Sequence, residues 1–114
     1  MKRLALSFIG IVASLHLVHA TEPTSDGWTT GSPRDEITPK FRHDPRGGRD
    51  RKGALVTESD ARDGLAGWWT RTVPVQGGRW YRFEAFRRIK NVVAPHRSVV
   101  ARVLWLDDSG TRHR

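Results

Sequence analysis

The sequence of 114 residues contains no cysteine. Without thiols the chain can form neither a disulfide framework nor a thiolate metal site, so its stability depends on packing. It also lacks, after residue 20, any further apolar stretch of the about 20 residues that a membrane span needs. Nucleophile-elbow and phosphate-loop motifs are missing as well, and we expect no enzymatic activity. The length allows one domain with a modest hydrophobic core.

The N-terminal segment has the pattern of a secretory signal peptide. The chain starts with the basic residues Lys2 and Arg3 after Met1, residues 4–18 are mostly apolar, and Val18 and Ala20 offer small or aliphatic side chains at the positions that a signal peptidase reads. We therefore expect a signal-peptide helix over 1–20 that is cleaved after Ala20, followed by a flexible tail over 21–26. The mature chain would be periplasmic or extracellular and would keep no stable membrane span.

The remaining chain consists of short stretches rich in β-forming residues, separated by clusters of glycine, proline and aspartate. The most regular part predicts a β-hairpin, because the Gln76-Gly77-Gly78 turn separates two alternating stretches. The expected strands cover residues 27–30, 37–41, 53–58, 67–75, 79–86 and 98–106, with loops over 43–53, 59–66 and 91–97.

This pattern predicts an all-β fold, an antiparallel β-sandwich over residues 27–114. The strand over 98–106 is apolar on both faces and is expected in a central position. Trp105 and one of Trp68 and Trp69 are expected in the core. Because such folds have about seven or eight strands and the strand after Gly110 has barely begun at residue 114, we expect an incomplete jelly roll that is truncated at its C-terminus.

Several short motifs resemble the galactose-binding-like jelly roll found in many carbohydrate-binding modules. They are the Gly67-Trp68-Trp69 stretch, the Val-Pro-Val stretch at 73–75, the Gly-Gly-Arg-Trp-Tyr-Arg-Phe stretch at 77–83 and residues 101–110. With residues 32–37 and 39–41, the chain is also similar to an N-terminal accessory module of bacterial exported carbon-nitrogen (nitrilase-like) hydrolases. The resemblance implies sugar binding or support of a hydrolase domain. The nucleophilic cysteine of that family has no counterpart here, so no activity carries over.

Four residues form the candidate ligand site. Aromatic rings stack against sugar rings, and arginine donates hydrogen bonds to hydroxyl groups, so the combination fits a glycan. The alternative is that the tryptophans fill a small core, because aromatic side chains bury large areas. In the expected hairpin, Trp80 points away from Tyr81 and Phe83, which favours exposure. The candidate site residues are Trp68, Arg79, Trp80 and Arg82.

The formal net charge of +8 comes from 20 basic and 12 acidic residues, which are interleaved along the chain. This mixture is typical of a solvated surface, and we expect no nucleic-acid partner. The surplus charge could still attract an anionic polysaccharide.

No cofactor is expected, although loop carboxylates could hold a structural Ca²⁺, as jelly-roll modules often do. The histidines lie in expected loops and do not suggest a metal site. The calcium candidates are Asp44, Asp50, Glu58, Asp60 and Asp63, and the histidines are His43, His96 and His113.

The sequence therefore predicts an exported, non-catalytic module that binds carbohydrate or serves as an accessory domain of a hydrolase. One alternative is a protein-docking domain without a small ligand. Another is a fragment of a secreted carbon-nitrogen hydrolase that lacks its catalytic domain.

Overall fold

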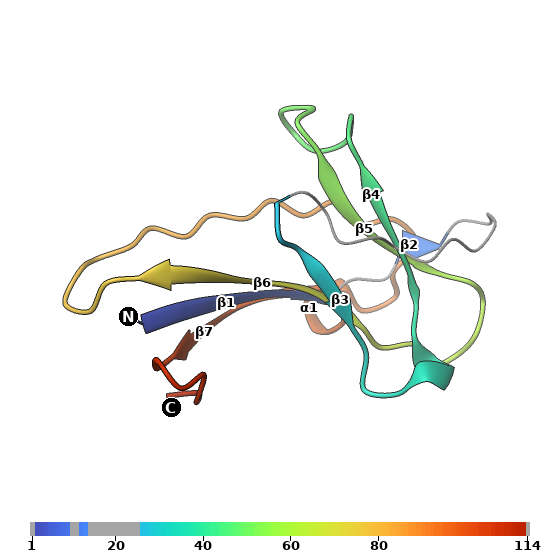
Figure 1. Ribbon diagram of the computed structural model, residues 1–114. Coiled ribbons are helices and arrows are strands. Elements are labelled where there is room, and N and C mark those ends of the chain that lie inside the picture. Colours follow the sequence, from blue (N-terminus) through green and yellow to red (C-terminus); the bar gives the residue numbers. More distant parts are fainter. Residues whose placement is uncertain (1, 10–11, 14–25, 114) are drawn as a thin grey trace.

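A computed structural model describes residues 2–9, 12–13 and 26–113, the first two segments as backbone only. The described chain is mostly strand, which confirms the expected all-β class (Figure 1). A short 3₁₀ helix and a four-residue α-helix are the helical elements of the described part. The strands are β1 (Lys2–Ile9), β2 (Val12–Ala13), β3 (Thr29–Gly31), β4 (Lys40–Asp44), β5 (Ala54–Ser59), β6 (Trp68–Val75) and β7 (Val100–Leu106), and the helices are η1 (Asp35–Ile37) and α1 (Pro95–Ser98).

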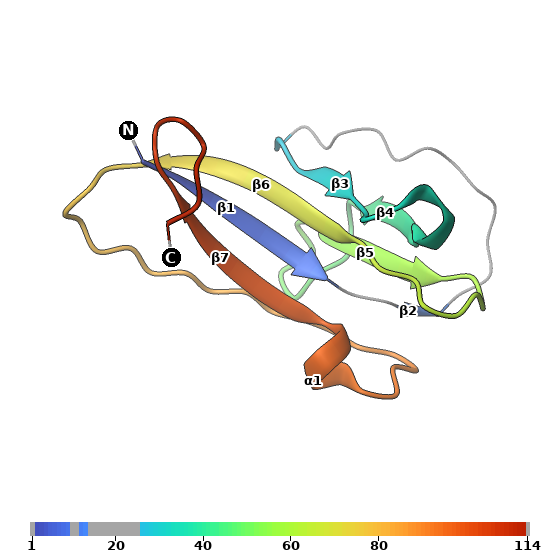
Figure 2. The same ribbon diagram turned by 90° about the horizontal axis from the view of Figure 1, so that it is seen from below.

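The strands form two sheets. The larger has the order β3-β6-β1-β7, and all its neighbours are antiparallel. The smaller has the order β2-β5-β4, in which β4 and β5 are antiparallel while β2 and β5 are parallel. Figure 2 shows the long strands β6, β1 and β7 running side by side. No helix among the described residues is long and apolar enough to cross a membrane.

The two sheets meet at Trp69 of β6, whose side chain is 1% exposed. Its ring stands edge-on to Phe41 of β4, with 5.5 Å between ring centroids. Its indole N–H donates a hydrogen bond of 3.2 Å to the carbonyl of Val56 in β5. The expectation that one of the two adjacent tryptophans lies in the core is thus confirmed for Trp69.

Gly67, just before β6, lies against the same contact. A Cβ added there would be 2.6 Å from Cζ of Phe41 and 2.7 Å from Cδ of Pro39. Gly67→Ala is therefore expected to lower the free energy of unfolding by about 1–2 kcal/mol, the cost of overpacking. Ala85→Val, which adds methyl groups at an exposed position, should leave a urea midpoint unchanged. Equal midpoints for the two variants would contradict the close approach.

The expected hairpin is only half right. The first strand is present as β6, and Gly78 adopts the positive φ of +75° that the turn requires. Residues 79–86 form no strand. The full-length antiparallel partner of β6 is instead β1, from the opposite end of the sequence.

The strand at 98–106 is confirmed as β7, but its expected central position is wrong. It lies at the edge of the larger sheet, and Trp105 is 42% exposed. The sequence pattern, apolar on both faces, did not reveal that β7 has one strand neighbour in its sheet. Expecting Trp105 in the core was therefore a mistake.

Prolines account for two smaller differences between the expected and the observed elements. The strand expected over 37–41 begins only at Lys40, because Pro39 has no N–H to donate to a ladder, and η1 precedes it. The loop expected over 91–97 contains the start of α1, where Pro95 occupies the first helical turn. The expected strands near 27–30 and 53–58 correspond to β3 and β5.

The N-terminal segment differs from its expected conformation. Residues Lys2–Ile9, expected within a signal-peptide helix, form strand β1. An apolar stretch without proline fits a strand with neighbours on both sides as well as it fits a helix. The expected cleavage site and most of the tail fall within residues 14–25, outside the described residues.

The turn after β7 forms as expected. One carboxylate oxygen of Asp107 accepts hydrogen bonds from the backbone N–H groups of Ser109 and Thr111, at 2.9 and 2.8 Å, and from the Ser109 hydroxyl at 2.6 Å. The Ser109 hydroxyl, followed by these N–H groups and the charge of His113, lowers the pKa of Asp107. The turn returns the chain so that Leu106 and Arg112 form a bridge.

Candidate functional site

The largest group of exposed aromatic side chains lies on one stretch, which we call the aromatic–basic segment (residues 78–90). It leaves the end of β6 and runs as an extended chain apart from the sheet (Figure 1). Five cationic residues and one acidic residue accompany the rings. The exposed aromatics are Trp80 (100%), Tyr81 (46%), Phe83 (40%) and Phe86 (61%), and the charged residues are Arg79, Arg82, Glu84, Arg87, Arg88 and Lys90.

The aromatic–basic segment is tied to the protein near both ends. At its start, the phenol oxygen of Tyr81 accepts a 2.8 Å hydrogen bond from the backbone N–H of Gln76. Towards its end, the Arg87 guanidinium donates to the carbonyl of Val99 and lies 3.2 Å from Nδ1 of His96. Phe86 also stacks under the Arg49 guanidinium, 4.5 Å from the ring centroid. These contacts fix the path of the segment without covering Trp80.

Trp80 and its arginine neighbours, Arg79 and Arg82, are exposed and can contact a ligand. The Trp80 side chain is fully exposed. Arg82 is 89% exposed and makes a 3.4 Å ion pair with Glu84, a surface contact of little strength. An exposed indole beside guanidinium groups can stack on a flat ligand face while donating hydrogen bonds to its hydroxyl or carboxylate groups.

Trp68 does not belong to this group. It is the first residue of β6, whereas Trp80 follows the other end of that strand, so the two lie far apart. The Trp68 indole covers Gly31 of β3, where an added Cβ would be 2.5 Å from Nε1. The structure thus places Arg79, Trp80 and Arg82 on one segment and assigns Trp68 to packing against β3.

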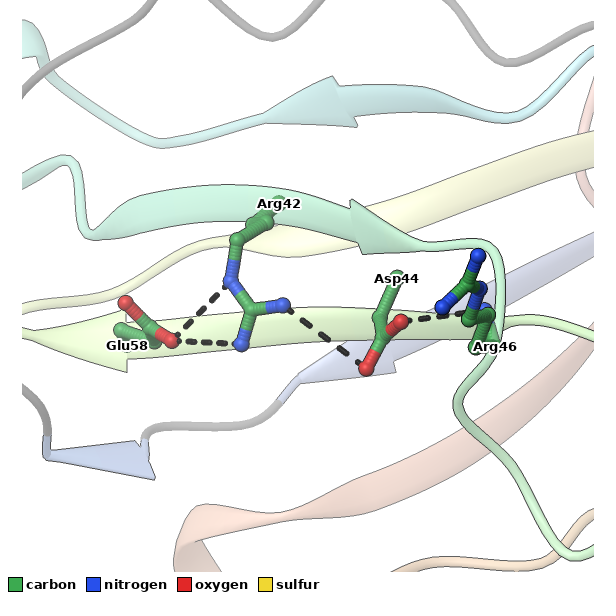
Figure 3. A network of polar contacts seen from close by, with 4 residues as sticks. All are labelled: Arg42, Asp44, Arg46 and Glu58. Atoms are coloured by element: carbon green, nitrogen blue, oxygen red, sulfur yellow. Dashed lines mark hydrogen bonds and ion pairs between the residues drawn. The ribbon is translucent and has the colours of Figure 1, made fainter. Parts of the chain in front are cut away.

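The smaller sheet carries a polar network that the sequence did not reveal (Figure 3). Glu58 of β5 is 7% exposed, and its carboxylate accepts hydrogen bonds from Nη2 and Nε of Arg42 at 2.9 and 3.3 Å. Asp44 lies 3.9 Å from Nη1 of Arg42 and accepts a 3.0 Å hydrogen bond from the backbone N–H of Arg46. The signal in the sequence was opposite charge at Arg42, directly after one expected strand (37–41), and at Glu58, the last residue of the next (53–58).

A second arginine holds the loops beside that sheet. Arg62 donates to the carboxylate of Asp60 and to the carbonyls of Glu36 and Thr38, each at 2.8 Å. The hydrogen bond from Arg62 lowers the pKa of Asp60. Arg62 therefore connects the loop after β5 to the turn before β4.

The calcium candidates are largely engaged by these cations. Asp44, Glu58 and Asp60 contact arginines, and Asp50 accepts a 3.1 Å hydrogen bond from the backbone N–H of Lys52. Within the described residues, no three acidic or histidine side chains are grouped as a metal site would require. His43 lies in β4 rather than in the expected loop.

A shallow pocket of about 100 Å³ lies between the loop before β5 and the stretch before β3. Ligand pockets for small molecules are commonly about 300–1,000 Å³, so this hollow is small for a sugar. An exposed surface, rather than this cavity, is the stronger candidate site. The pocket is lined by Asp26, Trp28, His43, Lys52, Gly53, Ala54 and Leu55.

Comparisons with protein-family models, with curated proteins and with solved structures find no match for this chain. The resemblance to a galactose-binding-like module therefore stays a prediction. The exposed side chains of the protein, chiefly those of the aromatic–basic segment, are the features that point to a function.

Proposed function

We propose that the protein is an exported, non-catalytic module that binds a polysaccharide through Trp80, Arg79 and Arg82. The observation that carries the proposal is the fully exposed Trp80 side chain between two arginines, on a segment tied down near both ends. Tethering reduces the ordering cost of binding, because the backbone around the indole is already held. The net charge of +8, or +6 without Lys2 and Arg3 of the signal segment, favours a polysaccharide with anionic groups.

The rest of the proposed assignment follows from the sequence. Residues 1–20 would direct export, and the module would lie in the periplasm or outside the cell. The two sheets would form a partial sandwich around Trp69, and the module would accompany a hydrolase domain. These parts do not depend on the glycan site and can fail separately.

The test is native affinity electrophoresis in gels containing polygalacturonate, an acidic polysaccharide, or a neutral β-glucan. The unmodified protein should be retarded more strongly by the acidic polymer. Trp80→Ala should abolish this retardation, because it removes the stacking surface. Its free energy of unfolding should stay within about 0.5 kcal/mol of the original, as for other exposed substitutions.

Trp105→Ala is the matched control, since it removes a second exposed tryptophan, which lies on β7 and not on the segment. It should leave retardation unchanged. Arg79→Ala and Arg82→Ala should each weaken retardation in the acidic gel more than in the neutral one. Full retardation of a folded Trp80→Ala protein would exclude Trp80 from the site.

A second candidate function is protein docking, favoured by the four exposed rings between Trp80 and Phe86. Aromatic residues and arginine are enriched in protein interfaces. Docking would be supported if the protein bound none of the polysaccharides but self-associated through these exposed rings. Sedimentation velocity of the unmodified and Trp80→Ala proteins measures that directly.

A further inference from the structure

Strand β1 occupies the middle of the larger sheet. It pairs antiparallel with β6 along Lys2–Ile9 and antiparallel with β7 along Arg3–Ile9. Figures 1 and 2 both show β1 lying between these two strands. Since β6 and β7 are each antiparallel to β1, they run parallel to one another and do not pair directly.

The rest of the chain depends on β1 to hold β7 in place. Besides its pairing with β1, the only ladder contact of β7 among the described residues is the bridge between Leu106 and Arg112. Without β1, the facing edges of β6 and β7 would expose two rows of backbone N–H and C=O groups. These edges therefore have the geometry of a binding site for one extended peptide.

The register defines the kind of peptide that fits. Leu4 lies opposite Val73 on one side and Trp105 on the other. Phe8 lies opposite Trp69 and Ala101. Leu6, the alternate position between them, lies opposite Arg71 and Val103. At two of these three positions both register partners of the peptide are therefore apolar, a pattern that favours this register.

We propose that the facing edges of β6 and β7 form an acceptor site for an extended apolar peptide, and that Lys2–Ile9 remains bound there after the chain is cut near Ala20. A cut at that position falls between β2 and β3 and breaks no pairing of β1. The N-terminal peptide would then be held by the two ladders of β1 and by the short parallel pairing of β2 with β5. This proposal is independent of the polysaccharide site.

The test uses the full chain with a site-specific protease sequence in place of residues 21–25. The folded protein is cut and passed over a gel-filtration column without denaturant, and its peak is analysed by mass spectrometry. The N-terminal peptide should co-elute with the larger fragment, and the amides of Val100–Leu106 should stay protected from hydrogen exchange. Urea should release the peptide.

Peptide exchange tests the site without refolding a variant. The cut protein is incubated with fluorescent peptides of residues 1–13, either unmodified or carrying Leu6→Pro or Leu6→Ile. Proline removes an N–H from the middle of a strand paired on both edges, so Leu6→Pro should bind about tenfold or more weakly. Leu6→Ile, which keeps the N–H and a similar volume, should bind within about threefold of the unmodified peptide.

Two results would overturn the proposal. One is separate elution of the N-terminal peptide while the larger fragment keeps protected β7 amides, which would show that β7 needs no inserted strand. The other is equal binding of the Leu6→Pro and unmodified peptides, which would show that attachment does not use the ladders.

Discussion

Trp69→Ala is expected to lower the free energy of unfolding by about 3–5 kcal/mol, the usual cost of truncating a buried tryptophan. Trp69 is the largest fully buried side chain described, and it joins the two sheets by its contact with Phe41 and its hydrogen bond to Val56. Small domains are stable by only about 5–15 kcal/mol, so a large part of the protein should be unfolded or partly open. Urea denaturation followed by circular dichroism measures the loss.

Two variants separate the effect of the buried position of Trp69 from the effect of its indole hydrogen bond. Trp105→Ala removes the same side chain from a position that is 42% exposed, and it should cost about 1 kcal/mol or less. Trp69→Phe keeps a ring near Phe41 but leaves the Val56 carbonyl without its donor, so an intermediate loss is expected. If Trp105→Ala costs as much as Trp69→Ala, the core does not lie where the two sheets meet.

Arg42→Met is expected to lower the free energy of unfolding by about 2–4 kcal/mol, because it leaves the mostly buried Glu58 carboxylate without the guanidinium that pairs with it. The Glu58 side chain is 10% exposed and the Arg42 side chain 52% exposed. Lys40, opposite Glu58 in the register, remains in the variant. Because Arg42 is half exposed and Lys40 supplies a second cation, the expected cost is below the upper end of the range for breaking a buried ion pair.

The double variant Arg42→Met/Glu58→Met should recover most of that stability, because apolar side chains of similar size can replace a buried ion pair. Arg82→Met is the surface control. Its pair with Glu84 is exposed on both sides, so the change should be about 0.5 kcal/mol or less. A double variant as unstable as Arg42→Met alone would mean that Glu58 is not the group left unpaired.

Local pattern was sufficient for much of the fold. Alternation and β-branched residues placed β5, β6 and β7, and the two aspartates and glycine after Leu106 placed the final turn. The pattern could not say which strands pair. The best candidate partner of β6 was the nearest stretch in sequence, residues 79–86, whereas the structure uses residues near the N-terminus, which carry an equally good apolar run.

The candidate site was predicted in part for the same reason. Trp80 is exposed, as the candidate site requires, but Tyr81 and Phe83, expected on the opposite and buried face, are exposed as well, and the hairpin from which the alternation was argued does not form. Trp68 was included because it is close in sequence to the same turn, but an eight-residue strand separates them. The anchoring contacts of Tyr81 and Arg87 are made with backbone groups, so the spacing of residue types along the sequence did not predict them.

The position of β1 also sets an order of events during synthesis. Arg3 pairs with Leu106, so the central strand is made about 100 residues before its second neighbour. Ribosomes add about 5–20 residues per second, and the N-terminal strand therefore waits several seconds before β7 exists. Contacts this distant in sequence make folding slow. Until β7 is made, the backbone edge of β1 that later pairs with it remains open to other partners, and once the sheet closes this edge is no longer accessible.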